Sequence, residues 1–308
     1  MAALTDDQAA VYDRQLRVWG VEVQKRLIAA RVLIAGSGSG LAAEVAKNIV
    51  LAGVGLVTIV DDTPSSSGGS SIGNFLVPSE SKDGSVAEAS ASTLQAMNPL
   101  ITVKSEPGSP STISAGLLQG HDIVVATDLT MLEAQRLDAL CTQHNKQLFI
   151  ASARGLNSYV FSNMQLYSYS QKESPEVTVK VQFDPLAVAL ATPLSKLTKK
   201  THPLFAVLRV VAAFEAAQGR PPGASDLAAL TEVGHSMAAS EGAPASVIRG
   251  ELLASFVTDT FEMAPVAAVT GGVLANYIVR AVSQAHSPLQ NFFFFCLFDG
   301  VGMVECLP

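Results

Sequence analysis

The sequence predicts an α/β fold in which a mostly parallel sheet continues into antiparallel strands and is flanked by helices. Between residues 31 and 153, short apolar runs alternate with segments of helical periodicity. A cluster of glycines directly follows the first of these apolar runs. From residue 158 onward, two segments alternate apolar and polar residues with period two, which is typical of antiparallel strands.

The first unit of this pattern is a strand, a glycine turn, a helix and a second strand. RVLIAGSGSG (31–40) predicts a buried strand that runs into the turn, and LAAEVAKNIVLAG (41–53) predicts a helix that ends at Gly53. LVTIVDD (56–62) predicts a second buried strand that ends in two acidic residues. This order defines a βαβ unit.

The alternation continues after a loop of low complexity at residues 63–74. The predicted elements are a helix at 86–99, strands at 101–106 and 121–128, a helix at 131–145 and a strand at 147–153. They extend the parallel sheet.

The second half of the chain predicts half-exposed antiparallel strands at 158–170 and 176–183. A helical stretch with a break at 219–225 reaches about Thr260, and a long apolar helix follows at 263–284. The last segment, 291–307, predicts a hairpin. Its four consecutive phenylalanines, Phe292 to Phe295, fit a strand that is buried on both faces.

The domain organisation that we expect is a single domain over residues 1–308. Within it, residues 1–30 form N-terminal helices, residues 31–155 form the parallel half, and residues 156–308 form the antiparallel strands and further helices.

The composition excludes several classes of function. The net charge of −7 argues against nucleic-acid binding, which needs a basic surface. Only 15% of the residues are charged and 48% are hydrophobic, which favours a buried core and a partner. We expect no membrane span and no secretory signal. The three cysteines form no C-x-x-C pair, so we expect reduced thiols in an intracellular protein and no metal site.

The glycine turn is the first candidate site. Gly36, Gly38 and Gly40 would let backbone N–H groups approach a phosphate, and Asp61 stands where an acid would bind a ribose hydroxyl. The alternative is a tight turn without a ligand, so that these residues are only the remains of a nucleotide site. A dehydrogenase would use the same unit, but no histidine has an acid at the spacing of a hydride relay.

Four segments together resemble the adenylation domains of the activating enzymes for ubiquitin-like proteins, the ThiF family. They are YDRQLRVWG (12–20), the glycine-turn segment (31–55), MAPVAAVTGG (263–272) and the closing segment NFFFF…VECL (291–307). The chain is most similar to the regulatory subunits of heterodimeric SUMO-activating enzymes. The resemblance covers about residues 8–307 and implies a Rossmann-like ThiF adenylation fold.

Active members of this family adenylate the C-terminus of a ubiquitin-like protein with ATP and magnesium, and then pass it to a cysteine as a thioester. They carry an Arg-Gln pair and a Lys that hold phosphates. The resemblance places these positions at Gly73, Asn74 and Val86, with Lys82 close by. We therefore expect an inactive adenylation domain that belongs to an ATP-dependent activating enzyme without being catalytic alone.

The resemblance gives Arg14 a role in trans. In this family, an arginine of the inactive half reaches the ATP of the active half, and Arg14 in YDRQ matches it. Arg17 is a second candidate, or it pairs with Asp13. From the residues alone, both arginines also fit a solvated helix with local ion pairs. Tyr12 and Trp19 fit packing roles.

The implied partners are a catalytic SUMO-activating subunit and, through the complex, SUMO and the conjugating enzyme. ATP and magnesium are expected in the partner subunit, none is expected on this chain alone, and the expected location is the nucleus, with the cytoplasm as a second location. Helix 263–284 lies either near the subunit contact or inside its own domain. The alternatives are a regulatory subunit for NEDD8 activation and an autonomous nucleotide-dependent enzyme.

Overall fold

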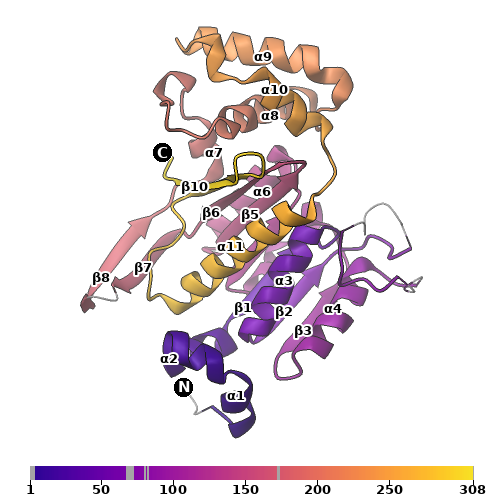
Figure 1. Ribbon diagram of the computed structural model, residues 1–308, viewed down its shortest axis with the longest axis vertical. Coiled ribbons are helices and arrows are strands. Elements are labelled where there is room, and N and C mark those ends of the chain that lie inside the picture. The colour runs from indigo at the N-terminus through magenta and orange to yellow at the C-terminus, as the bar shows by residue number, and fades with distance from the viewer. Residues whose placement is uncertain (1–3, 67–72, 80, 82, 172–173, 308) are drawn as a thin grey trace.

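The computed structural model describes residues 4–66, 73–79, 81, 83–171 and 174–307. Its described part contains an eight-stranded sheet in the order β10-β9-β6-β5-β4-β1-β2-β3 and a separate ribbon of β7 and β8 (Figure 1). Strands β1 to β5 are mutually parallel, whereas β6, β9 and β10 join the sheet antiparallel. The expected fold class is confirmed.

The strands have the following bounds: β1 Arg31–Ala35, β2 Leu56–Val60, β3 Thr102–Glu106, β4 Ile123–Thr127, β5 Gln147–Arg154, β6 Asn157–Asn163, β7 Leu166–Gln171, β8 Ser174–Gln182, β9 Phe292–Cys296 and β10 Val301–Glu305.

The α-helices have the following bounds: α1 Asp6–Val11, α2 Asp13–Ala29, α3 Gly40–Ala52, α4 Val86–Met97, α5 Ala115–Gln119, α6 Met131–Gln143, α7 Leu186–Leu190, α8 Leu204–Gln218, α9 Leu227–Ser240, α10 Gly250–Thr258 and α11 Ala264–Ser283.

The sheet is the middle layer between two groups of helices. Along β1, Val32 and Ile34 point into a core shared with α3, α4 and α11, whereas Leu33 and Ala35 point into a core shared with α6 and α8. Successive side chains of a strand face opposite sides of the sheet, so a strand that is apolar throughout is buried on both faces. This explains the unbroken apolar runs of β1 and β4.

Strand β6 corrects the expectation for residues 158–170. This segment forms two strands, and β6 is buried over its whole length between β5 and β9 instead of half exposed. The polar residues of its alternation have partners inside the protein. Ser158 shares a 2.6 Å hydrogen bond with Thr270, and Ser162 Oγ donates to the carbonyl of Leu289 at 2.6 Å. Polar residues in a period-two pattern therefore do not guarantee exposure.

Helix α11 lies along α3, as Figure 1 shows. A Cβ added to Gly271 would lie 2.6 Å from Cβ of Glu44, so this glycine permits the close approach of the two helices. By length and composition alone, α11 could cross a membrane, with a mean hydropathy of 1.4. Its contacts with α3 and β6, however, are those of a core helix.

Helices α1 and α2 lie at the far end of α3 from its glycine turn (Figure 1). Helix α2 has a kink at Gly20, which adopts a φ of +83°. Tyr12, between the two helices, is buried, and its hydroxyl accepts a 3.0 Å hydrogen bond from Asn98. Trp19 Nε1 donates to Gln24 at 3.0 Å, and Gln24 in turn donates to the carbonyl of Ala52 at 3.0 Å. The packing roles expected for Tyr12 and Trp19 are confirmed.

Substitution of Gly53 by alanine should weaken the packing of the N-terminal helices on α3 and lower the free energy of unfolding. Gly53 has a φ of +90°, and a Cβ there would lie 2.7 Å from the Tyr12 ring. The left-handed conformation costs a non-glycine residue on the order of 1–3 kcal/mol, and overpacking adds about 1–3 kcal/mol. Urea denaturation measures the loss in the free energy of unfolding.

Gly219→Ala is the matched control, because Gly219 has a φ of +66° and open space around it. It should reproduce the backbone strain without the collision. Equal losses for the two variants would show that Tyr12 does not press on Gly53.

Candidate functional site

The glycine turn lies at the carboxyl end of β1, beside β4. The chain crosses from β3 at the edge of the sheet back to β4 on the other side of β1, and such a reversal of strand order opens a crevice where α/β proteins bind ligands. Gly36 has a φ of +82°, and a Cβ there would lie 2.7 Å from the carbonyl oxygen of Thr127. Only glycine fits this position without strain. The turn ends at Ser39, which caps α3 by accepting a 3.1 Å bond from the amide of Ala42.

The first amides of α3 already have an anionic partner, Glu262. The amide of Gly40 donates to Glu262 Oε2 at 2.6 Å, and the amide of Leu41 donates to Oε1 at 2.9 Å. Burial raises the pKa of Glu262 and the nearby Asp128 charge adds to this, while the two amides oppose the shift. Sequence analysis missed this residue, because no local pattern links it to a turn 222 residues away.

Asp61 is buried and also binds the turn. Its Oδ2 accepts from the amide of Ser37 at 2.9 Å and from the Ser37 hydroxyl at 3.1 Å, while Oδ1 accepts from the amide of Thr63 at 2.9 Å. Oδ2 therefore fastens the turn to the end of β2, whereas Oδ1 binds the backbone that follows this strand. Its expected role toward a ribose hydroxyl, like the roles of Gly36, Gly38 and Gly40 toward a phosphate, stays a prediction.

The positions that the resemblance assigns to Arg, Gln and Lys carry no charge at the turn. A Cβ on Gly40 would lie 2.8 Å from the carbonyl oxygen of Gly73, so the Gly73 backbone lies directly against the turn. Asn74 donates to the carbonyl of Ser37 at 2.6 Å. Val86 is fully buried at the start of α4. Lys82 lies outside the described residues.

Two further acidic groups border the same crevice. Asp128, at the end of β4, has a φ of 58° and accepts a 3.1 Å bond from Ser152. Desolvation by the surrounding protein raises the pKa of Asp128, against the opposing effect of the Ser39 and Ser152 hydroxyls and the Arg154 charge. Glu215 accepts a 3.0 Å bond from the amide of Leu132 in the first turn of α6. Carboxylates thus occupy the N-termini of both helices that begin at this crevice.

Arg14 lies at the opposite end of α3. Its neighbour Gln15 donates to the carbonyl of Leu51 at 2.9 Å, in the last turn of that helix. At 1.5 Å per residue, the 12 residues from Gly40 to Ala52 separate this end from the glycine turn by roughly 18 Å. Arg14 is exposed, and no hydrogen bond or ion pair joins it to any residue that the structure describes. It is therefore free to meet a group outside the chain.

Arg17 forms the ion pair that the sequence offered as one alternative. Its guanidinium lies 2.8 Å from Asp13, one helical turn earlier, and both side chains are largely exposed. A surface pair at this spacing contributes only about 0.3–0.5 kcal/mol, so it fixes neither residue firmly.

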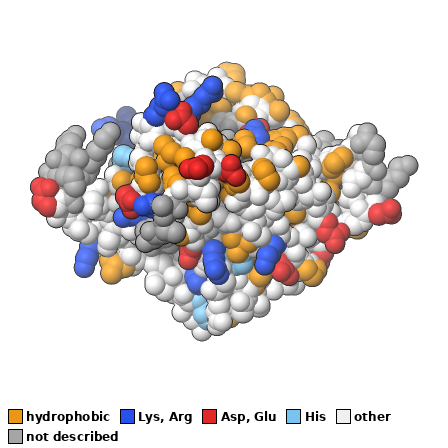
Figure 2. Space-filling view, turned by 90° about the horizontal axis from the view of Figure 1, so that it is seen from below, with side chains coloured by type: hydrophobic (Ala, Val, Ile, Leu, Met, Phe, Trp, Pro, Cys, Tyr) orange, Lys and Arg blue, Asp and Glu red, His pale blue; other side chains and the backbone are white. Residues whose placement is uncertain are grey.

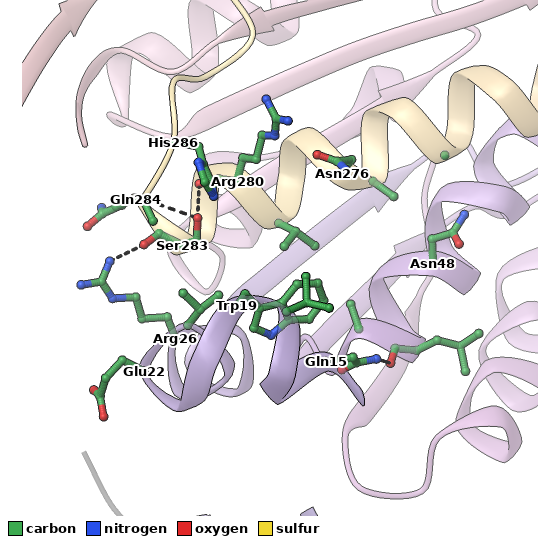
Figure 3. A pocket seen from close by; sticks show the side chains of 18 of the residues that line it. Gln15, Trp19, Glu22, Arg26, Asn48, Asn276, Arg280, Ser283, Gln284 and His286 are labelled. Atoms are coloured by element: carbon green, nitrogen blue, oxygen red, sulfur yellow. Dashed lines mark hydrogen bonds between the residues drawn. The ribbon is translucent and has the colours of Figure 1, made fainter. Parts of the chain in front are cut away.

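A groove of about 810 Å³ lies between α2, α3 and α11, and Gln15, the neighbour of Arg14 in sequence, lines it (Figure 3). Val18 and Trp19 border it from α2, Asn48 and Leu51 from α3, and Gly272 from α11. At one end, Arg26 donates to the carbonyl of Ser283 and ties α2 to the end of α11. In α11, Gly271 therefore packs against α3 inside the domain, whereas the next residue, Gly272, lines the groove.

The surface around α1 and α2 carries mixed charge. Figure 2 views the molecule from this end and shows scattered basic and acidic side chains, without a continuous basic area among the side chains drawn in colour. This distribution agrees with the net charge of −7 and does not suit a phosphate backbone.

The fold and the glycine turn define a Rossmann-like α/β domain, and a family model specifies its family. The model of the ThiF family matches residues 12–303, and the chain belongs to this family. Relatives are similar over nearly their whole length. SUMO-activating enzyme subunit 1A of Arabidopsis thaliana is 33% identical over 98% of this chain and 96% of its own. SUMO-activating enzyme subunit 1 of Xenopus tropicalis is 33% identical over 99% of this chain and 97% of its own. The same subunit of Homo sapiens is 32% identical over 99% of this chain and 96% of its own.

The cysteines should differ sharply in reactivity. Burial raises the pKa of the Cys141 thiol to about 12, whereas Cys306 is exposed. Since the thiolate is the nucleophile, iodoacetamide should alkylate native Cys141 more than about 100-fold more slowly than Cys306. Peptide mass spectrometry of the native chain measures both rates, and denatured chain is the control. Equal rates in the native chain would contradict the buried position of Cys141.

Proposed function

We propose that this chain is the regulatory subunit of a heterodimeric SUMO-activating enzyme. Relatives named SUMO-activating enzyme subunit 1, from plants and animals, are similar to it from end to end. In this proposal the chain binds a catalytic subunit and completes the ATP site of that subunit with Arg14. The complex then adenylates the SUMO C-terminus, forms the thioester and delivers SUMO to the conjugating enzyme, with ATP and magnesium held by the partner.

The observation that carries the role of Arg14 is its position. It is exposed, lacks a partner among the described residues and lies one helix length from the glycine turn of its own chain. A side chain extends only a fraction of that length, so the Arg14 guanidinium cannot reach the glycine turn of its own chain. A guanidinium keeps its charge at any relevant pH and offers several donors to phosphate oxygens. It stabilises charge that develops on phosphates in the transition state.

The groove of α2, α3 and α11 fits the contact with the catalytic subunit. Val18 and Leu51 are exposed apolar side chains that border the groove, and Val21 and Val269 are further exposed apolar side chains on the same helices. Apolar surface gathered on adjoining elements is typical of a protein interface. Because Arg14 and Val18 lie one turn apart on α2, a partner bound in the groove at Val18 would come within reach of the Arg14 side chain.

The two alternatives are not favoured. The relatives described above are named for the SUMO system. An autonomous adenylating enzyme or dehydrogenase would need its own turn for a nucleotide, but the first amides of α3 already bind Glu262.

Arg14→Ala should abolish most of the ATP–pyrophosphate exchange of the reconstituted complex with SUMO. An arginine contributes on the order of 10³–10⁵ in rate to phosphoryl transfer, and we expect a loss of about 10³-fold here. Arg14→Lys should restore part of the rate, since lysine keeps the charge but not the planar fork. Arg17→Ala should change the rate less, because Arg17 pairs with Asp13. The complex should still elute intact from a sizing column.

Two results would refute this role for Arg14. One is exchange by this chain without a partner. The other is an unchanged rate for Arg14→Ala in a complex of normal affinity.

Val18→Glu should weaken the binding of the catalytic subunit by at least about tenfold. Val18 is 78% exposed on the groove, and a carboxylate there would lose its hydration on burial in the contact. Val188→Glu is the matched control, because Val188 is 48% exposed on α7, away from the groove. Isothermal titration calorimetry measures both affinities. Equal affinities for the two variants would place the partner elsewhere.

A further inference from the structure

The first turn of α3 has the chemistry of an anion site. Free amides and the helix dipole at an N-terminus stabilise negative charge, which is why phosphates bind at such turns. Here each oxygen of Glu262 accepts from one amide, at 2.6 and 2.9 Å. The carboxylate therefore satisfies two donors that a nucleotide phosphate would otherwise use.

The space above the turn is closed as well. The carbonyl oxygen of Gly73 would lie 2.8 Å from a Cβ on Gly40, and Glu262 Oε2 would lie 3.2 Å from a Cβ on Gly73. Gly73 also has a φ of +101°, so both the backbone conformation and the lack of a side chain let it lie against the turn. Glu262 and Gly73 together cover the amides.

The charges around the turn also oppose a phosphate. The Asp128 charge acts on Glu262, and Asp61 holds the other side of the turn through Ser37. Arg154, whose charge acts on Asp128, lies 5.3 Å from the Phe256 ring centroid and donates to the Phe256 carbonyl at 3.4 Å. A phosphate would add negative charge next to carboxylates, so the residues present do not fit one.

We propose that the Glu262 carboxylate takes the place of a nucleotide phosphate at this glycine turn and excludes a phosphate from this chain. The same carboxylate fastens the start of α11 to α3. Glu262 stands two residues before Ala264, the first residue of α11. The contact therefore fixes one end of α11 at the glycine turn, while Gly271 fixes its middle against Glu44. The proposal does not depend on Arg14 or on a partner.

The test uses the full chain without a partner and inorganic pyrophosphate as the probe. Backbone amide NMR follows the Gly40 and Leu41 resonances in wild type, Glu262→Ala and Glu262→Gln. Wild-type resonances should stay unmoved at concentrations that shift those of Glu262→Ala. The apparent Kd should be at least about tenfold lower for the alanine variant, since it frees both amides. Glu262→Gln should bind with intermediate affinity, because it removes the charge but keeps the volume.

Glu232→Ala is the matched control, because Glu232 is an exposed acid of α9 with no hydrogen bond to any described residue. It should behave like wild type. If Glu262→Ala does not fold, Glu262→Gln alone decides. Binding of pyrophosphate to wild type as tight as to the variants would overturn the proposal. So would an absence of binding in every variant, because exclusion would then not rest on Glu262. Neither result bears on Arg14, since no adenylation is measured.

Discussion

Helix α3 is held at each end by residues from distant parts of the chain, and the rest of the site depends on this. At its N-terminus, the amides of Gly40 and Leu41 bind Glu262, which precedes α11. At its C-terminus, the carbonyl of Ala52 accepts from Gln24 of α2, and the carbonyl of Val50 accepts from Asn98 after α4. Backbone groups at helix ends need such partners when they are buried. One helix thereby fixes the positions of α2 and α11.

This arrangement separates the two features that sequence analysis had placed close together in the chain. The glycine turn begins at Gly36 and Arg14 stands only 22 positions earlier, yet α3 holds them roughly one helix length apart. The turn faces the crevice between β1 and β4, whereas α2 borders the groove with α3 and α11. A single chain can therefore close its own crevice and still present a cation to another molecule.

The elements that sequence analysis predicted correctly are those with a strong local pattern. The apolar runs of β1, β2 and β4 and the glycine that ends α3 needed no tertiary information, since burial and backbone conformation determine those residue types. Strand β6 was misjudged because its serines find partners in other segments. Glu262 was missed for the same reason. Its partners lie 221 and 222 positions away, and a lone glutamate before a helix carries no signal of its own.

The neighbours of Arg14 explain why its guanidinium forms no ion pair with any described residue. An arginine on an acidic chain tends to find a carboxylate, and Asp13 is adjacent to it in sequence. Asp13 instead pairs with Arg17, which lies four residues on and therefore on the same helix face, whereas consecutive residues of a helix point apart. The acids around the glycine turn, Glu262, Asp61 and Asp128, lie at the far end of α3 and bind amides or hydroxyls there. Among the described residues, Arg14 therefore keeps an unpaired charge on the helix that borders the groove.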